Sequence, residues 1–188
     1  MPGRHHYRHC NSFADVASRG TVVIIRNEQT LNTQNMLVSI IQFIGLSLLM
    51  LVAGVFWGTW FSLSRSIERI SAETFLENGR WFIKNLARPM QILMPLTILV
   101  MILGIFVYPD KRTSGFYLNL IAFVLFIATL LITLIVEVPI DRQIQGWTIS
   151  TLPVNWMILR HKWQRYHTLR TFICIASFLL FAVSVVFY

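Results

Sequence analysis

The sequence has 188 residues, of which 55% are hydrophobic and only 13% are charged. A water-soluble domain carries about twice that share of charges, so this composition excludes an ordinary soluble globule, a disordered chain and a disulfide scaffold. The 16 Lys and Arg residues outnumber the 8 Asp and Glu residues, which gives a formal net charge of +8. The basic residues flank apolar blocks, a pattern that indicates membrane topology signals and not nucleic-acid binding.

Residues 1–34 are polar, basic and without periodicity, and they include His5, His6 and His9. We expect a disordered tail there and no metal site, because the histidines lack the ligand spacing of a metal centre. No apolar run follows the basic residues within the first 30 positions, so a secretory signal is excluded. Met36 stands directly before the first apolar block. A second expectation is therefore that Met36 is the true start and that residues 1–35 are a gene-model extension.

Four apolar blocks follow, at about residues 36–63, 90–108, 117–140 and 171–188. At 1.5 Å of rise per residue, each can cross a hydrocarbon core of about 30 Å, the two shorter ones with help from flanking residues. The runs are continuous and do not alternate, which indicates helices and not strands of a barrel. The sequence thus predicts an all-α membrane protein with four transmembrane helices in a bundle.

One tight turn and two long connections join these blocks. The Tyr-Pro-Asp-Lys segment at 108–111 predicts a turn between the second and third helices. Residues 64–88 and 141–170 form the long connections, and both carry charges and aromatic rings at helical spacing. Pro89 and Pro95 are expected near the start of the second helix, where proline is tolerated or introduces a kink.

The Lys and Arg residues near the spans predict an orientation. The turn at 108–111 adjoins only Lys111 and Arg112, while the two long connections are much richer in basic residues. The positive-inside rule then places both connections in the cytoplasm and both termini outside, in a multi-pass protein of the plasma (inner) membrane. The basic tail opposes this orientation unless the chain starts at Met36. The basic residues of the connections are Arg65, Arg69, Arg80, Lys84 and Arg88, then Arg142, Arg160, Lys162, Arg165 and Arg170.

A stripe of rings and cations follows the helix start predicted at Pro153 and Asn155. Its members recur every three or four residues, which puts them on one helix face that continues into the fourth span through Cys174 and Ser177. Such a row is costly to bury in lipid unless it faces a cavity or acidic partners. The stripe consists of Trp156, Arg160, Trp163, His167 and Arg170.

Two interpretations of the stripe stay open. In the first it lines a pocket for a lipophilic aromatic molecule: Trp156 and Trp163 form flat walls, and Arg160 and Arg170 hold a phenolate or enolate. His167 is then the proton acceptor, because its unperturbed pKa is near neutrality. In the second, the helix is an ordinary basic and aromatic anchor at the lipid headgroups, which periodicity alone favours.

Glu137 and Asp141 lie four residues apart and share a face if the helix continues through Pro139. We expect them to form structural ion pairs, with Glu137 as a buried base in the alternative. The candidate partners are Arg88, Arg160 and Arg170.

Trp57 and Trp60 lie near the end of the first span and indicate an aromatic belt, or else the opposite wall of the pocket. Gly54 and Gly58 have the spacing typical of helix packing. The cores of the spans hold no histidine, so a bis-histidine haem is not expected. The sequence also has no Gly-rich phosphate loop, GxSxG or HExxH motif, so nucleotide chemistry and triad or zinc hydrolysis have no support, and we expect no metal.

These residues resemble the anthrone oxygenase-like family of small integral membrane proteins, over about residues 37–187. The resemblance implies a four-helix membrane bundle that oxidises polyketide anthrones to anthraquinones with O2, without metal or flavin. It further implies that His167 removes a substrate proton, that Arg160 or Arg170 stabilises the enolate, and that the enolate reduces O2. No cofactor is then expected, because the substrate itself supplies the electrons. The substrate would lie among Asn155, Trp156, Trp163, Trp57 and Trp60. The residues that carry the resemblance are Val138, Pro139, Ile140, Pro153, Asn155, Trp156, Arg160, Trp163, His167 and Arg170, with Gly54, Ser64, Arg88 and Pro89 as a looser part.

Two further function classes stay open beside the oxygenase. One is a non-enzymatic bundle that binds a lipid or a partner protein. The other is a small transporter, which has the least support because four spans without a mid-membrane charge offer little pathway for a solute.

Overall fold

The computed structural model describes the backbone of residues 6–186 and the side chains of residues 28–29, 31–67 and 69–186. Throughout this part of the chain the regular structure is helical, without a strand. Four of its helical segments are long and apolar enough to cross a membrane: Leu31–Ser64, Ala72–Val107, Ser114–Gly146 and Trp156–Val186. The prediction of an all-α protein with four membrane-spanning helices is confirmed, and the chain is a multi-pass membrane protein.

The chain divides into two compact units, Met1–Ile40 and Ile41–Tyr188. Helix α1 (His6–Thr59) begins in the first unit and ends in the second. Residues 6–35 are helical, which differs from the disordered tail expected from the sequence. They hold no proline and a single glycine, so nothing in them stops a helix. His5 lies outside the described residues, as do the side chains of His6, His9 and Cys10.

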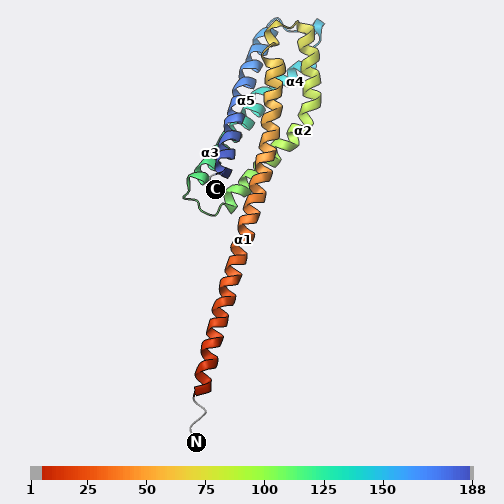
Figure 1. Cartoon of the computed structure of the whole chain (residues 1–188). Helices are drawn as coiled ribbons and strands as arrows, with labels where there is room; N and C mark the ends of the chain where they lie inside the picture. The colour runs from red at the N-terminus through yellow and green to blue at the C-terminus, as the bar shows by residue number, and fades with distance from the viewer. Residues whose placement is uncertain (1–5, 187–188) are drawn as a thin grey trace. The chain divides into compact units, whose positions relative to one another are not determined.

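The second unit contains the bundle (Figure 1). After α1 come the π-helical turn η1 (Trp60–Ser64), the 3-10 turn η2 (Ile67–Arg69) and helix α2 (Ala72–Val107). Helix α3 (Ser114–Ile132) passes through the π-helical turn η3 (Thr133–Glu137) into α4 (Val138–Gly146). The 3-10 turn η4 (Ile149–Thr151) leads to α5 (Trp156–Val186).

The spanning helices extend well beyond the apolar blocks of the sequence. Most of each predicted long connection belongs to a helix end, so that only residues 65–71 and 147–155 separate the spans. Apolarity marks only the part of a helix in hydrocarbon, whereas backbone hydrogen bonding continues the helix to a cap. Ser71 provides such a cap for α2, because its Oγ accepts a hydrogen bond of 3.3 Å from the Thr74 main-chain N–H.

Both prolines of the second span lie inside α2, and not near its start as expected, since the helix already begins at Ala72. Pro89 and Pro95 each remove one backbone hydrogen bond and thereby bend the helix. Figure 1 shows α2 changing direction along its length.

The turn expected at 108–111 is confirmed between α2 and α3. The Asp110 carboxylate accepts a hydrogen bond of 2.9 Å from the Arg112 main-chain N–H, and the Thr113 hydroxyl caps α3 by accepting from the Phe116 N–H at 3.3 Å. These contacts join the two helices as a tight hairpin.

Two apolar clusters form the interior of the bundle. Helices α3 and α5 are held together by a hydrogen bond of 2.7 Å from the Ser177 hydroxyl to the Ala122 carbonyl. The middle cluster comprises Leu49, Val52, Ala53, Phe56, Met94, Met101, Ala122, Phe126, Cys174 and Phe181. The cluster next to the two connections comprises Leu63, Ile67, Phe75, Leu76, Ile140, Ile144 and Trp163.

Close helix approach uses other glycines than those expected. A Cβ atom on Gly45 would lie 3.1 Å from the Phe181 ring, and one on Gly79 would lie 3.1 Å from Ile144. Around Gly54 and Gly58 there is open space within the described part of the chain. The packing predicted for the Gly54–Gly58 pair is therefore not formed inside this bundle.

Candidate functional site

The predicted stripe on α5 faces the interior of the bundle. Arg160, Trp163, His167 and Arg170 are buried, and Cys174 and Ser177 continue the buried row. Lys162 and Arg165, on the same stretch of helix, are exposed. A headgroup anchor would present the row outward, so the burial contradicts the second interpretation of the stripe.

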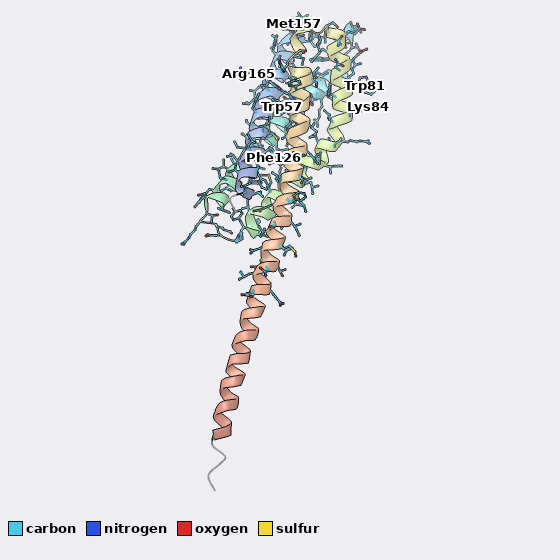
Figure 2. All side chains as sticks on the ribbon, in the orientation of Figure 1. Trp57, Trp81, Lys84, Phe126, Met157 and Arg165 are labelled. Atoms are coloured by element: carbon cyan, nitrogen blue, oxygen red, sulfur yellow. The ribbon has the colours of Figure 1, made fainter. Side chains whose placement is uncertain are left out.

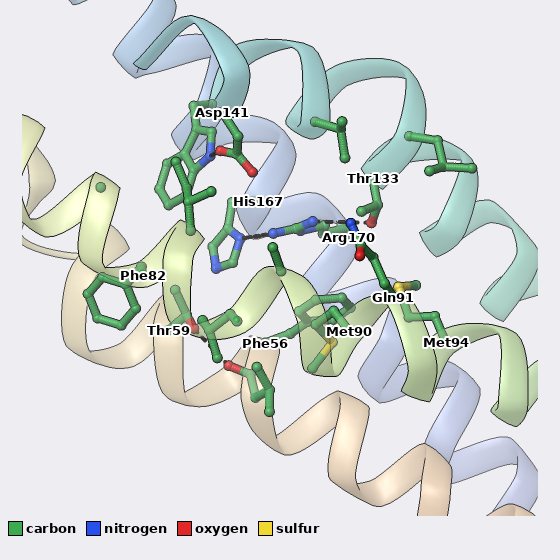
Figure 3. A pocket seen from close by; sticks show the side chains of 18 of the residues that line it. Phe56, Thr59, Phe82, Met90, Gln91, Met94, Thr133, Asp141, His167 and Arg170 are labelled. Atoms are coloured by element: carbon green, nitrogen blue, oxygen red, sulfur yellow. Dashed lines mark hydrogen bonds between the residues drawn. The ribbon is translucent and has the colours of Figure 1, made fainter. Parts of the chain in front are cut away.

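A cavity of about 440 Å³ lies beside this face, in the half of the bundle next to the two connections (Figure 3). Most of its wall is apolar, with side chains from α1, α2, η3, α4 and α5. Its volume falls within the range of about 300–1,000 Å³ that is typical of small-molecule sites. The polar residues of the wall are Thr59, Gln91, Thr133, Asp141, Arg142, His167 and Arg170.

Arg170 contacts several polar side chains in and beside the cavity wall. Its Nη2 lies 3.2 Å from Oε2 of Glu137, which is completely buried, and its Nη1 donates to the Thr133 hydroxyl at 3.1 Å. Its Nε and Nη2 lie 3.3 and 2.8 Å from Nδ1 of His167. The guanidinium also lies over the Phe56 ring, 4.6 Å from its centroid. Of the three arginines expected as partners of Glu137, Arg170 is therefore the one that forms the ion pair.

The π-helical turn η3 places two of these partners, because Thr133 is its first residue and Glu137 its last. Pro139 follows at the start of α4 and has no N–H to offer the preceding turn, which accounts for the irregular hydrogen bonding there. Turns of this kind are frequent at functional sites. The helix nevertheless continues, so Glu137 and Asp141 both face α5.

His167 is held between two aromatic side chains. Its ring stacks on the Trp163 indole with centroids 4.9 Å apart, and the Phe56 ring meets it edge-on at 6.4 Å. Trp163 is itself fixed by a hydrogen bond of 3.0 Å from its Nε1 to Oδ1 of Asp141. Figure 3 shows Asp141, His167 and Arg170 in a row along the cavity.

The other two members of the stripe do not line the cavity. Arg160 is buried and lies over the Trp156 ring at 4.8 Å, and Trp156 in turn contacts Phe75 at the end of the bundle. Asn155 is exposed and does not line the cavity either.

The tryptophans of the first span lie away from the cavity, Trp57 in α1 and Trp60 in the turn η1. Trp57 and Trp60 stack on each other with centroids 5.0 Å apart and pack against Phe172 of α5. Trp60 Nε1 donates to the Thr168 hydroxyl at 3.2 Å. Neither ring lines the cavity. Of the two interpretations of this pair, the aromatic belt agrees with its position and the pocket wall does not.

Arg88 is exposed on α2, and among the described side chains it forms no ion pair with either carboxylate. The same helix surface carries Trp81 and Lys84, which also point outward (Figure 2). Asp141 uses its hydrogen bond to Trp163 in place of an arginine partner. Within the described part of the chain, no group of three or more His, Cys, Asp or Glu residues could hold a metal ion.

Several wall residues were not anticipated from the sequence. Phe56 and Thr59 of α1 and Leu63 of η1 line the cavity. Phe56 and Thr59 each directly precede one of the expected tryptophans. Helix α2 contributes a row at helical spacing that begins in the predicted connection and continues into the predicted second span: Gly79, Phe82, Leu86, Met90 and Met94. The three- and four-residue spacing of this row was the signal that could have identified it.

Comparison with known proteins identifies the family of the chain. No curated protein and no solved structure matches the chain. The sequence profile of a family described as anthrone oxygenase matches residues 80–180, more than half of the chain. This segment contains Asp141, Trp163, His167 and Arg170, and the residues of the α2 row from Phe82 onward. The chain therefore belongs to the anthrone oxygenase family.

Proposed function

We propose that this protein is a membrane-embedded oxygenase that oxidises a lipophilic aromatic or quinone-like compound with O2. One observation carries the proposal: an otherwise apolar cavity has Asp141, His167 and Arg170 in its wall. An apolar wall suits a ring system, and a few convergent polar atoms suit the oxygen of a phenol or ketone. Membership of the anthrone oxygenase family supports the same class of substrate.

The overall reaction needs little from the protein besides proton handling and charge stabilisation. An anthrone methylene loses two hydrogens and becomes a carbonyl; one atom of O2 enters that carbonyl and the other leaves in water. The substrate supplies the electrons once it is deprotonated to a delocalised anion. Hydrogen-bond donors in a water-poor site stabilise such an anion strongly. Arg170 and His167 are positioned for this role, whereas Arg160 lies outside the cavity.

We further propose the plasma membrane as the location, with the connections at 65–71 and 147–155 in the cytoplasm. Basic residues concentrate at the helix ends that adjoin these connections. The cavity would then lie in the cytoplasmic half of the bilayer, where an apolar substrate accumulates by partition.

The second candidate function is non-enzymatic binding of a lipid. Leu134 favours it, because this residue lines the cavity and is still 53% exposed at the surface that faces the bilayer. An acyl chain could therefore reach the cavity from the side.

Quinone formation by purified protein separates the two candidates. Protein in detergent micelles is mixed with anthrone and air-saturated buffer, and quinone absorbance and O2 uptake are followed together. The oxygenase predicts quinone formation above the rate in empty micelles, and a strong loss in the His167→Ala variant. Equal rates with protein and with empty micelles would favour the lipid-binding function.

A further inference from the structure

Arg170 determines which nitrogen of His167 carries the proton. A guanidinium has N–H donors and no acceptor, and two of its nitrogens lie 3.3 and 2.8 Å from Nδ1. Nδ1 must therefore accept and be unprotonated. An imidazole whose Nδ1 is unprotonated is neutral and carries its hydrogen on Nε2.

The protonated Nε2 is available to a ligand. It is buried and has no hydrogen-bond partner within the described part of the chain. The main chain of Phe56 interacts with the ring but completes no hydrogen bond with Nε2. Figure 3 shows this nitrogen turned away from Arg170, toward the cavity. In this state His167 presents an N–H group and has no free nitrogen with which to accept a proton, which disagrees with its expected role as the base.

Of the two carboxylates near the cavity, Asp141 is placed to accept a proton. Glu137 is fully buried, forms the ion pair with Arg170 and does not line the cavity. Asp141 lines the cavity and uses one oxygen, Oδ1, for Trp163 Nε1. Its Oδ2 has no hydrogen bond to any described residue, and the side chain is half-buried, so a proton taken up there can return to water.

We propose that Asp141 is the proton acceptor of this cavity and that His167 is a hydrogen-bond donor to the substrate. This assignment rests on the proposed function. In the step, a C–H or O–H bond of the substrate breaks, the proton moves to Oδ2 of Asp141, and the electron pair stays on the substrate. The resulting anion is delocalised onto an oxygen that accepts the Nε2–H of His167. Asp141 becomes a neutral acid and no oxidant is consumed before O2 enters.

Anaerobic deuterium exchange isolates this step from the reaction with O2. Purified protein in micelles is mixed with anthrone in D2O without oxygen, and deuterium incorporation at the methylene carbon is measured against empty micelles. Two conservative variants separate the roles. Asp141→Asn retains an oxygen for Trp163 but cannot accept the proton, and His167→Gln retains an N–H group but is not a base.

We expect Asp141→Asn to slow exchange by about 100-fold or more, the usual contribution of a positioned base, while His167→Gln slows it by about tenfold at most. Anthraquinone affinity is measured for both variants, and the loss of exchange in Asp141→Asn should be much larger than its loss of affinity. Exchange that survives in Asp141→Asn and is lost in His167→Gln would overturn the assignment while leaving the oxygenase intact. A wild-type protein that neither exchanges deuterium nor forms quinone would overturn the proposed function and this assignment together.

Discussion

The imidazole of His167 lies parallel to the indole of Trp163, with an angle of 2° between the rings and 4.9 Å between their centroids. Trp163 in turn donates to Asp141 of α4, while His167 accepts from Arg170, which pairs with Glu137 of η3. A continuous set of contacts therefore runs from one carboxylate to the other through three side chains of α5. Trp163 holds the His167 ring by stacking on one face, and Arg170 holds it by its hydrogen bonds to Nδ1. Nε2 has no partner among the described residues and is available to a ligand.

Trp163→Phe should weaken this set of contacts without emptying the space beside His167. Phenylalanine retains a ring for stacking but has no N–H for Asp141, so we expect a loss of about 1–2 kcal/mol of unfolding free energy. Denaturant titration of the protein in detergent measures it. Trp81→Phe is the matched control, since Trp81 is 65% exposed, and its effect should stay within about 0.5 kcal/mol. An equal loss in both variants would contradict the role of the Trp163–Asp141 hydrogen bond.

Arg170→Ala should destabilise the bundle severely. It leaves the Glu137 carboxylate buried without its cation, and it removes the donors to His167 and Thr133. Breaking a buried ion pair from one side costs about 3–5 kcal/mol. Thermal melts in detergent should show a large loss for Arg170→Ala and none for Arg88→Ala, because Arg88 is exposed.

The double variant Arg170→Met with Glu137→Leu separates charge from packing. It removes both charges together, so it should be more stable than Arg170→Ala. A double variant as unstable as the single one would show that Arg170 acts through its contact with Phe56 and not through Glu137.

Continuous apolar runs were sufficient to predict the four spans, because lipid-exposed positions must be apolar. The direction of the α5 stripe was not predictable in the same way, since periodicity alone favours the headgroup anchor and the structure buries the stripe. The spacing did place Trp163, His167 and Arg170 on one helix face, and this face lines the cavity. It could not show where the cavity ends along the helix, so Arg160 and Trp156 were placed in the wall although they lie beyond it.

The partners of the stripe could not be predicted, because they depend on the rotation of neighbouring helices. Phe56 and Thr59 line the cavity in the structure. A rotation of the first span about its axis by one residue, or about 100°, would put Trp57 and Trp60 there in their place. The ion pair between Glu137 and Arg170 likewise depends on the π-helical turn η3. In the sequence, Pro139 is the only local indication of this irregular turn. The cavity residues in the first half of α2 could not be predicted, because the charged residues around them indicate a connection between spans. In the structure this stretch belongs to α2.

Ala87→Phe should fill part of the cavity and lower affinity for an aromatic ligand. Ala87 lines the cavity from α2, so a phenyl ring there occupies space that a bound ring system needs. We expect the affinity for anthraquinone to fall by about tenfold or more, since overlap of this size costs about 1–3 kcal/mol. Quenching of tryptophan fluorescence reports the binding.

The control for this variant is Leu99→Phe, on the same helix but 53% exposed toward lipid. It adds a ring of the same size outside the cavity and should bind as the wild type does. Equal affinity in Ala87→Phe and the wild type would mean that the ligand binds elsewhere.

Cysteine labelling should place the cavity in the cytoplasmic half of the membrane. Val154 is fully exposed in the connection before α5, and Lys111 is exposed in the turn between α2 and α3. Cys10→Ser provides the background, because the remaining Cys174 is buried. In intact cells, a membrane-impermeant maleimide should label Lys111→Cys at once and Val154→Cys only after the membrane is permeabilised. The reverse pattern would place the basic connections outside and contradict the positive-inside prediction. The cavity would then open toward the outer leaflet, and a substrate made in the cytoplasm would have to cross the bilayer to reach it.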